Sequence, residues 1–334
     1  MITGSTGMVG SNIAALLKQD KDDDLLLPSH EELDLCNANN IKKYLEQKQP
    51  EIIIHAAGKV GGIQANINSP LEFFLENLDM GRNLIVLAYE LGIKNVLNLG
   101  SSCMYPRNHD EALKEDLVLK GELEPTNEGY ALAKCAVAKL CEYIDKSNEN
   151  YNYKTVIPCN LYGPGDKFSP EHSHMVPSII HKLHSAKVEG QQNVNIWGTG
   201  KVRREFMYVE DMAGVVGKCI KIFEQLPCYM NVGIGHDYTV DEYYKIVADV
   251  IGYSGGFTYD LSKPEGMKRK LVDISIQKSL DLYIETPLRI GIEKTYEFYL
   301  KNIADERNFP IFQTEMITGV VSSELMNTLE EKLA

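Results

Sequence analysis

The chain has 334 residues, of which 44% are hydrophobic and 24% charged, values ordinary for a folded globular protein of about two domains. Its 47 acidic residues exceed its 34 basic ones, and the net charge of -13 argues against nucleic acid as a partner. No apolar run approaches the roughly 20 residues that cross a bilayer, so no membrane partner is expected. Seven cysteines without C-x-x-C spacing or a secretory signal indicate reduced thiols and a cytoplasmic location.

Short apolar strands alternate with helical patterns over the first 160 residues, an order typical of a parallel sheet covered by helices. The predicted strands are residues 24–28 (DLLLP), 51–58 (EIIIHAAG), 95–102 (NVLNLGSS) and 154–164 (KTVIPCNLYGP). The predicted helices are residues 37–49, 69–92 and 127–146, which carry apolar residues at helical spacing. The sequence therefore predicts an α/β fold, a Rossmann-type doubly wound parallel sheet with a smaller mixed α/β C-terminal substrate domain.

A glycine-rich turn opens the chain, with Gly4, Gly7 and Gly10 spaced three and three. Such a turn between a strand and a helix lets the backbone approach a pyrophosphate at the helix N-terminus. A tight turn without a ligand is the competing interpretation. Because only three residues precede Gly4, either the numbering begins after part of the first strand or this strand is unusually short.

The end of the second strand bears on cofactor choice. In NAD-selective sites an acid about 20 residues after the glycines binds the ribose 2′-hydroxyl. Pro28, Ser29 and His30 stand at that point, so the acid is absent, which favours NADP(H). No arginine is present there to bind a 2′-phosphate, so the residues leave NAD(H) open. Asp34 is better placed for the adenine, or else is a solvated loop acid.

Tyr130 and Lys134 are spaced i, i+4 in a predicted helix, so their side chains lie one above the other. A lysine cation beside a phenol lowers the phenol pKa, ordinarily about 10, and gives a proton donor usable near neutral pH. Ser101 follows the preceding strand and can add a hydrogen bond to the same reacting oxygen. Such a pair is common by chance, but the serine, the glycine-rich turn and their order favour catalysis over a structural role.

With these residues the chain resembles the extended short-chain dehydrogenase/reductases and, within them, the GDP-L-fucose synthase family. The resemblance spans about residues 1–300 and implies an NADPH-dependent enzyme that converts a GDP-4-keto-6-deoxy-sugar of the GDP-4-keto-6-deoxymannose type to a 3,5-epimerised 4-hydroxy product such as GDP-L-fucose. The stretches that carry it are GMVGS (7–11), HAAGKVGGI (55–63), NLGSSCMYP (98–106), EPTNEGYALAK (124–134), NLYGPGDKFSPEHSHMVP (160–177), WGTGKVRREFMYVEDMA (197–213) and SKPEGMKRKLVD (262–273).

The resemblance assigns catalytic acid/base roles to Cys103 and His174. A ketone at C4 acidifies the hydrogens at C3 and C5, so a base and an acid can invert each centre through an enolate. The competing interpretations are a small buried hydrophobic residue for Cys103 and a loop histidine bonded to backbone for His174. Cys159 is expected in the core. The predicted catalytic residues are Ser101, Cys103, Tyr130, Lys134 and His174, with no metal.

The resemblance also implies cofactor contacts from the glycine-rich turn, the loop after the second strand and the ends of the later strands. The predicted cofactor-binding residues are Gly4, Ser5, Thr6, Gly7, Met8, Val9, Gly10, His30, Asp34, Leu35, Leu99, Gly100, Lys134, Pro158, Asn160, Leu161 and His174.

For a nucleotide-sugar, the resemblance implies that Trp197 packs on the substrate and that cations lie near its diphosphate. The predicted substrate-binding residues are Lys182, Trp197, Arg204, Glu265 and Lys270. An ion pair with Glu205 or Asp211 is the alternative for Arg204. Lys182 replaces an arginine of relatives, and Gly256 aligns with another, so the sugar is left open. The alternative functions are a 4-reductase acting only on a GDP-4-keto-6-deoxy-heptose or other pre-epimerised GDP-sugar and, more remotely, a non-catalytic nucleotide-sensing module.

The predicted organisation has two domains and a tail. Residues 1–160, together with 203–225, form the NADP(H)-binding domain, and residues 161–202 and 226–304 form the nucleotide-sugar-binding domain. Residues 305–334 are a C-terminal tail of unknown role. Helices 69–92 and 127–146 are apolar on more than one face, and relatives pair through the equivalent helices, so a homodimer is expected.

Overall fold

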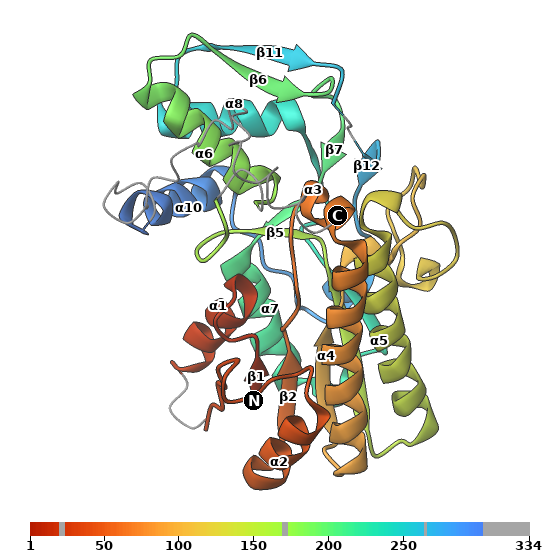
Figure 1. Ribbon diagram of the computed structural model, residues 1–334. Helices are drawn as coiled ribbons and strands as arrows, with labels where there is room; N and C mark the ends of the chain where they lie inside the picture. The colour runs from red at the N-terminus through yellow and green to blue at the C-terminus, as the bar shows by residue number, and fades with distance from the viewer. Residues whose placement is uncertain (20–23, 169–172, 264–265, 303–334) are drawn as a thin grey trace, which may run out of the picture.

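The computed structural model describes residues 1–19, 24–168, 173–263 and 266–302. A parallel sheet in the order β1-β2-β3-β4-β9 forms the lower part of the molecule, and a second unit with β6, β11, α6, α8 and α10 lies above it (Figure 1). The strands are β1 Ile2–Thr3, β2 Ile52–His55, β3 Asn95–Leu99, β4 Asn152–Pro158, β5 Asn160–Tyr162, β6 Asn193–Trp197, β7 Arg203–Arg204, β8 Phe206–Tyr208, β9 Tyr229–Val232, β10 Tyr238–Thr239, β11 Gly256–Asp260 and β12 Arg269–Lys270. The α-helices are α1 Met8–Leu17, α2 Ala38–Lys48, α3 Ile63–Asn68, α4 Pro70–Glu90, α5 Glu128–Ser147, α6 Met175–Val188, α7 Val209–Lys221, α8 Val240–Ile251, α9 Ser275–Ser279 and α10 Leu288–Asn302.

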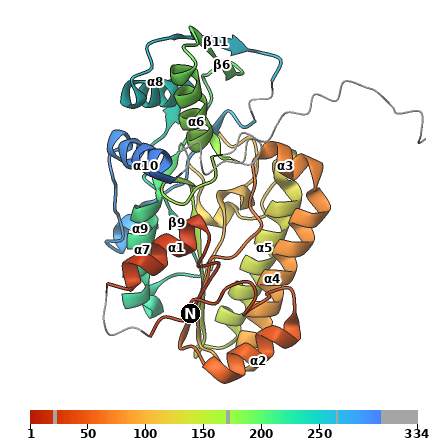
Figure 2. The same ribbon diagram turned by 60° about the vertical axis from the view of Figure 1, so that its left-hand side comes forward.

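Helices cover both faces of the parallel sheet (Figures 1 and 2). Successive side chains of a strand point to opposite faces, and here both faces are apolar. On β2, Ile53 packs into a core with α2, α4 and α5, whereas Ile54 packs into the core with α1 and α7. Val96 and Leu97 on β3 divide in the same way. The α/β doubly wound fold is confirmed, and helices 37–49, 69–92 and 127–146 match α2, α4 and α5.

Two predicted strands are wrong in detail. Residues 24–28 form no strand; they run beside β1 with one backbone bond, from Ile2 N to Leu26 O at 2.9 Å. Because β1 has only two residues, it offers too few partners for a longer ladder. Residues 154–164 divide after Pro158, where β4 ends, and β5 leaves the main sheet to pair with β8.

The second unit has its own core, formed by α6, α8 and α10 around Ile180, Ile196 and Tyr243. Strand β9 pairs with β4 in the main sheet, although the sequence placed residues 226–232 in the second domain. We therefore propose the predicted domain division with β9 moved to the first domain. The predicted tail at 305–334 lies outside the described residues. Among the described helices, none combines the length and apolar character that a membrane span requires.

Candidate active site

The glycine-rich turn joins β1 to α1, and its glycines are fixed by close backbone packing. Gly4 has a φ of 68°, and a Cβ there would lie 2.7 Å from Ala57 Cα. A Cβ on Gly10 would lie 2.2 Å from the carbonyl oxygen of Gly4. Gly7 is the N-cap of α1 and offers no side chain to bond the first N–H groups of the helix. These free donors and the positive helix end fit the pyrophosphate of a dinucleotide cofactor.

The loop after residues 24–28 approaches this turn, because Ser5 Oγ donates to Pro28 O at 3.5 Å. His30 is exposed at the same end. The Asp34 carboxylate accepts a bond from Cys36 N at 2.9 Å, which keeps it in a local turn, and Leu35 is buried. The predicted roles of these residues toward ribose and adenine stay predictions.

Tyr130 and Lys134 lie in the first two turns of α5, and Lys134 Nζ is 5.9 Å from the centre of the Tyr130 ring. Lys134 is buried and donates to Leu99 O at 3.0 Å. Burial lowers the pKa of its ammonium to about 8, and the charge of Cys103 opposes that effect. The structure thus brings the predicted pair together at the carboxyl end of β3.

The predicted lowering of the Tyr130 pKa is wrong for this structure. Burial raises the pKa of the phenol above its ordinary 10, the charge of Cys103 raises it further, and a hydrogen bond with Ser101 lowers it. The ammonium of Lys134 points to a backbone carbonyl instead of the phenol oxygen, so it does not offset the loss of water.

Cys103 follows Ser101 in the short helix Ser102–Met104, and several donors surround its sulfur. Ser101 Oγ donates to Cys103 Sγ at 3.2 Å and accepts from Cys103 N at 3.3 Å. Asn127 Nδ2 donates to the same sulfur at 3.2 Å, and Lys270 Nζ lies 3.9 Å from it. Cys103 is half-buried among polar groups, so the interpretation of it as a small buried hydrophobic residue is wrong, whereas Cys159 lies in the core as expected.

His174 is the N-cap residue of α6 and is half-buried. Burial lowers the pKa of its imidazole, and the positive charges of Lys270 and Lys167 lower it further. Lys270 thus contacts the Cys103 sulfur, and its charge also acts on the pKa of His174. The predicted role of Lys270 near the substrate diphosphate stays a prediction.

The cations of the predicted substrate site lie on paired strands, since Arg204 on β7 is in parallel register with Lys270 on β12. The Glu205 carboxylate accepts from three backbone N–H groups, and Asp211 accepts from Thr286, so the predicted ion-pair alternative for Arg204 is wrong. Asp237 holds these strands together through Arg203 at 2.6 Å and Arg269 at 2.5 Å.

The other predicted substrate residues lie on the second unit. Trp197 ends β6 with 60% of its surface exposed, and Lys263 Nζ is 5.4 Å from its ring centre, so the ring is accessible for stacking. Lys182 on α6 is half-buried, and its ammonium donates to the backbone oxygen of Asn195 on β6. Glu265 lies outside the described residues.

The strand ends place the remaining predicted cofactor residues. Leu99 ends β3 and Gly100 directly follows it, and Pro158, Asn160 and Leu161 lie where β4 passes into β5. In open parallel sheets ligands bind at these carboxyl ends.

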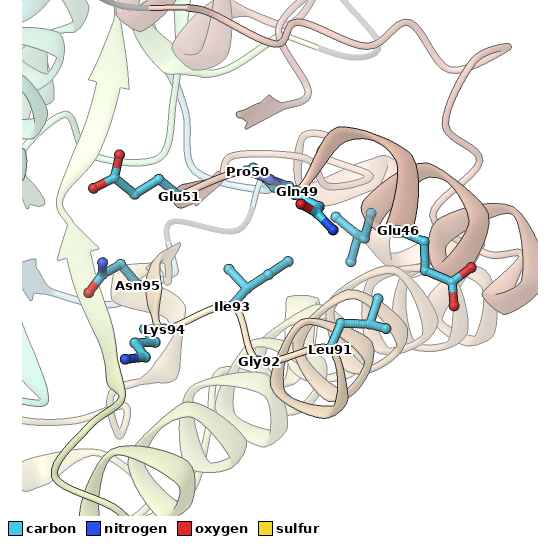
Figure 3. Close-up of a pocket in the computed structure, with 10 residues that line it drawn as sticks. Glu46, Gln49, Pro50, Glu51, Leu91, Gly92, Ile93, Lys94 and Asn95 are labelled. Carbon is cyan, nitrogen blue, oxygen red and sulfur yellow. The ribbon is translucent and has the colours of Figure 1, made fainter.

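A hollow of about 540 Å³ lies at the opposite edge of the sheet, between the C-terminal ends of α2 and α4 and the amino ends of β2 and β3 (Figure 3). Glu46, Glu51 and Lys94 are among the residues that line it. It is therefore separate from the candidate active site.

Sequence reasoning missed Asn127. It stands three residues before Tyr130 in the stretch EPTNEGY, a spacing that places both residues on one side of a helix start. This spacing from Tyr130 was the one feature of the sequence that could have identified Asn127 as a site residue.

Comparisons with known proteins agree with this geometry. Residues 1–233 match the model of the NAD dependent epimerase/dehydratase family. The chain is 51% identical over 300 residues to GDP-L-colitose synthase of Yersinia pseudotuberculosis, covering 90% of this chain and 97% of the relative. It is 46% identical to GDP-L-fucose synthase of Azorhizobium caulinodans, covering 90% and 96%. The structure of MlghC, a GDP-mannoheptose C4 reductase from Campylobacter jejuni with NADP bound, matches with a TM-score of 0.81 at 31% identity, covering 90% and 97%. The chain therefore belongs to the NAD dependent epimerase/dehydratase family, and within it to the enzymes related to GDP-L-fucose synthase.

Proposed function

We propose that this enzyme is an NADPH-dependent 3,5-epimerase/4-reductase that converts GDP-4-keto-6-deoxymannose, or a close GDP-4-keto-6-deoxy-sugar, to a product such as GDP-L-fucose. One observation carries the proposal. Cys103 and Tyr130 lie in one site: the Cys103 sulfur accepts from Ser101 Oγ and from Asn127 Nδ2 at 3.2 Å each, Asn127 stands three residues before Tyr130, and the charge of Cys103 raises the pKa of the Tyr130 phenol. An acid/base thiol and a proton-donating phenol can therefore act on one bound sugar, which two successive reactions at neighbouring carbons require.

The chain's own residues account for the proton transfers. In the proposed mechanism Cys103 removes the proton from C3 or C5, the ketone oxygen takes the negative charge as an enolate, and His174 returns a proton from the other face. NADPH, when bound, supplies the hydride for C4. Tyr130 then gives its proton to the C4 oxygen, and Ser101, which lowers the pKa of the phenol, favours the phenolate that remains.

NADP(H) is proposed over NAD(H) as the cofactor. No acid stands at Pro28, Ser29 and His30, where NAD-selective sites bind the ribose 2′-hydroxyl, and MlghC binds NADP. Titration of cofactor fluorescence with NADPH and NADH compares the two affinities directly. Tighter binding of NADH would contradict this choice.

Two alternatives are tested by the same product experiment. The relative at 51% identity is named GDP-L-colitose synthase, so a GDP-sugar other than GDP-4-keto-6-deoxymannose is an alternative substrate. MlghC is named as a C4 reductase. Turnover of GDP-4-keto-6-deoxymannose and its 3-deoxy counterpart in D₂O, with mass spectrometry and NMR of the products, separates these functions. We expect deuterium at C3 and C5 of the first product; an unlabelled reduced product would establish a reductase alone, and cofactor binding without any oxidation would favour a nucleotide sensor.

A homodimer in the cytoplasm completes the proposal. Helices α3, α4 and α5 leave large apolar side chains in solvent, as expected of a surface that pairs with a second copy. These residues are Ile63, Ile67, Leu71, Leu75, Leu132 and Tyr143. Light scattering should give twice the chain mass of 37.5 kDa, and a monomer would refute the dimer.

A further inference from the structure

Asn127 lies beside the predicted acid/base cysteine at the start of the catalytic helix. It ends the short helix Pro125–Asn127, directly before α5 begins at Glu128. Its backbone N–H donates to Glu124 O at 3.1 Å, so the backbone position is fixed. Its side chain therefore enters the site from a rigid element, three residues before Tyr130.

The two ends of the Asn127 amide have different surroundings. Nδ2 donates to Cys103 Sγ at 3.2 Å. Oδ1 is buried and has no hydrogen-bond partner in the structure. A buried acceptor without a partner is costly, and such groups are concentrated where a ligand or water supplies the missing donor. Oδ1 and Nδ2 belong to one planar amide, and Nδ2 bonds the Cys103 sulfur. A group that donates to Oδ1 must therefore also lie close to Cys103.

Hydrogen-bond donors approach the sulfur from separate elements. Besides Asn127, Ser101 Oγ lies 3.2 Å and Lys270 Nζ 3.9 Å from Cys103 Sγ. A thiol has a single hydrogen to give, so a sulfur among several donors is held chiefly as an acceptor. Ser101 has a predicted role at the reacting oxygen, and Lys270 has one near the substrate diphosphate. Asn127 is uncharged and has neither role.

We infer that Asn127 is a positioning residue that holds Cys103 through its amide N–H and orients the sugar by accepting a ring hydroxyl at Oδ1. This inference rests on the proposed function, because the sugar is the ligand that carries the hydroxyl. The amide couples the two partners: the sugar hydroxyl and the sulfur are fixed at opposite ends of one planar group. The carbon next to the hydroxyl is thereby presented to the sulfur.

Two variants of similar size separate the two ends of the amide. Asn127→Asp keeps an acceptor oxygen but replaces the donor by a negative charge, and Asn127→Leu removes both. Iodoacetamide alkylation at pH 7, measured by peptide mass spectrometry, compares Cys103 with exposed Cys36 in the same molecule. We expect the Cys103 rate to fall about tenfold or more in both variants while the Cys36 rate stays constant. An unchanged ratio of the two rates would show that the hydrogen bond from Asn127 to the Cys103 sulfur has no effect on Cys103, and would overturn this part of the inference.

Steady-state kinetics test the other end of the amide with GDP-4-keto-6-deoxymannose. We expect Asn127→Asp to keep KM within about threefold of the wild type while deuterium exchange at C3 and C5 slows. Asn127→Leu should also raise KM by about tenfold, because the hydroxyl loses its acceptor. A wild-type KM in Asn127→Leu would overturn the substrate contact.

The exposed neighbour provides the control, since Glu128→Gln should change neither the alkylation ratio nor KM. Thermal unfolding of each variant identifies one that does not fold, and either variant alone still tests the sulfur contact. A wild-type protein that neither exchanges nor reduces this sugar would refute the proposed function, whereas the alkylation ratio would still report on Asn127 and Cys103.

Discussion

Glu142 ties the catalytic helix to the central sheet, and its removal is expected to weaken that connection. Its carboxylate accepts from Lys139 Nζ at 2.7 Å, Lys146 Nζ at 2.5 Å and Tyr229 Oη at 2.7 Å. The lysines belong to α5, which carries Tyr130, and Tyr229 opens β9. These donors outweigh burial and lower the pKa of the carboxyl from 4.5 to about 2.

The lowered pKa gives the size of the effect. The difference between 4.5 and about 2 corresponds to about 3.5 kcal/mol, at about 1.4 kcal/mol per pH unit. Side chains of Lys139 and Lys146 are 32% and 64% exposed, so water screens both ion pairs. We therefore expect Glu142→Gln to lower the free energy of unfolding by about 1–2 kcal/mol at pH 7.

Urea unfolding followed by circular dichroism measures this loss of stability. Its dependence on pH shows whether the ionised carboxylate is responsible. A carboxyl whose pKa is lowered by folding stabilises the protein above its unfolded value of 4.5, and the contribution is lost as pH falls toward about 2. The difference between wild type and Glu142→Gln should therefore be constant from pH 8 to 6 and shrink below about pH 4.5. Exposed Glu90→Gln on α4 is the matched control and should have little effect. A difference that persists unchanged at pH 3.5 would refute the ionic explanation.

Three substitutions test the site itself. Tyr130→Phe should lower kcat for reduction by about 10²–10⁴-fold, while deuterium exchange at C3 and C5 continues through Cys103; loss of both reactions together would contradict separate proton donors. Gly10→Ala should abolish NADPH binding in a fluorescence titration, because its Cβ would lie 2.2 Å from Gly4 O. Trp197→Ala should raise KM for the GDP-sugar by about tenfold and leave NADPH affinity intact, since its ring is exposed on the second unit; equal loss of both affinities would argue against stacking on the substrate.

The sequence predicted the fold well where one pattern determined one element. Helices α2, α4 and α5 lie within about two residues of their predictions, because each has a continuous apolar face that packs on the sheet. The strand predicted at 24–28 failed because strand formation depends on a partner, and β1 offers only two residues. Local composition describes an extended apolar segment but does not reveal the length of its neighbour.

The same distinction applies to the active site. Spacing along one helix predicted that Tyr130 and Lys134 lie together, and the structure confirms it. The contact between Lys270 and Cys103 joins residues 167 positions apart, and no local pattern reports such a distance. The Tyr130 pKa shows the same limit, since the sequence identifies a neighbouring cation but not the burial that outweighs it.

The buried carboxylate of Glu205 contributes to the position of Lys270, together with the pairing of β7 and β12. Glu205 is fully buried and accepts backbone bonds from Ile234 and Gly235 at 2.8 Å each and from Val272 at 2.9 Å. It directly follows Arg204, and Val272 lies two residues beyond Lys270, so this side chain fixes both cations relative to the end of β9. Strand β9 and strand β3, which Cys103 follows, belong to the same sheet, so the bonds of Glu205 connect Lys270 of the second unit to the sheet that carries Cys103. The candidate active site therefore draws residues from both units, with Cys103 and Tyr130 on the first and Lys270 on the second.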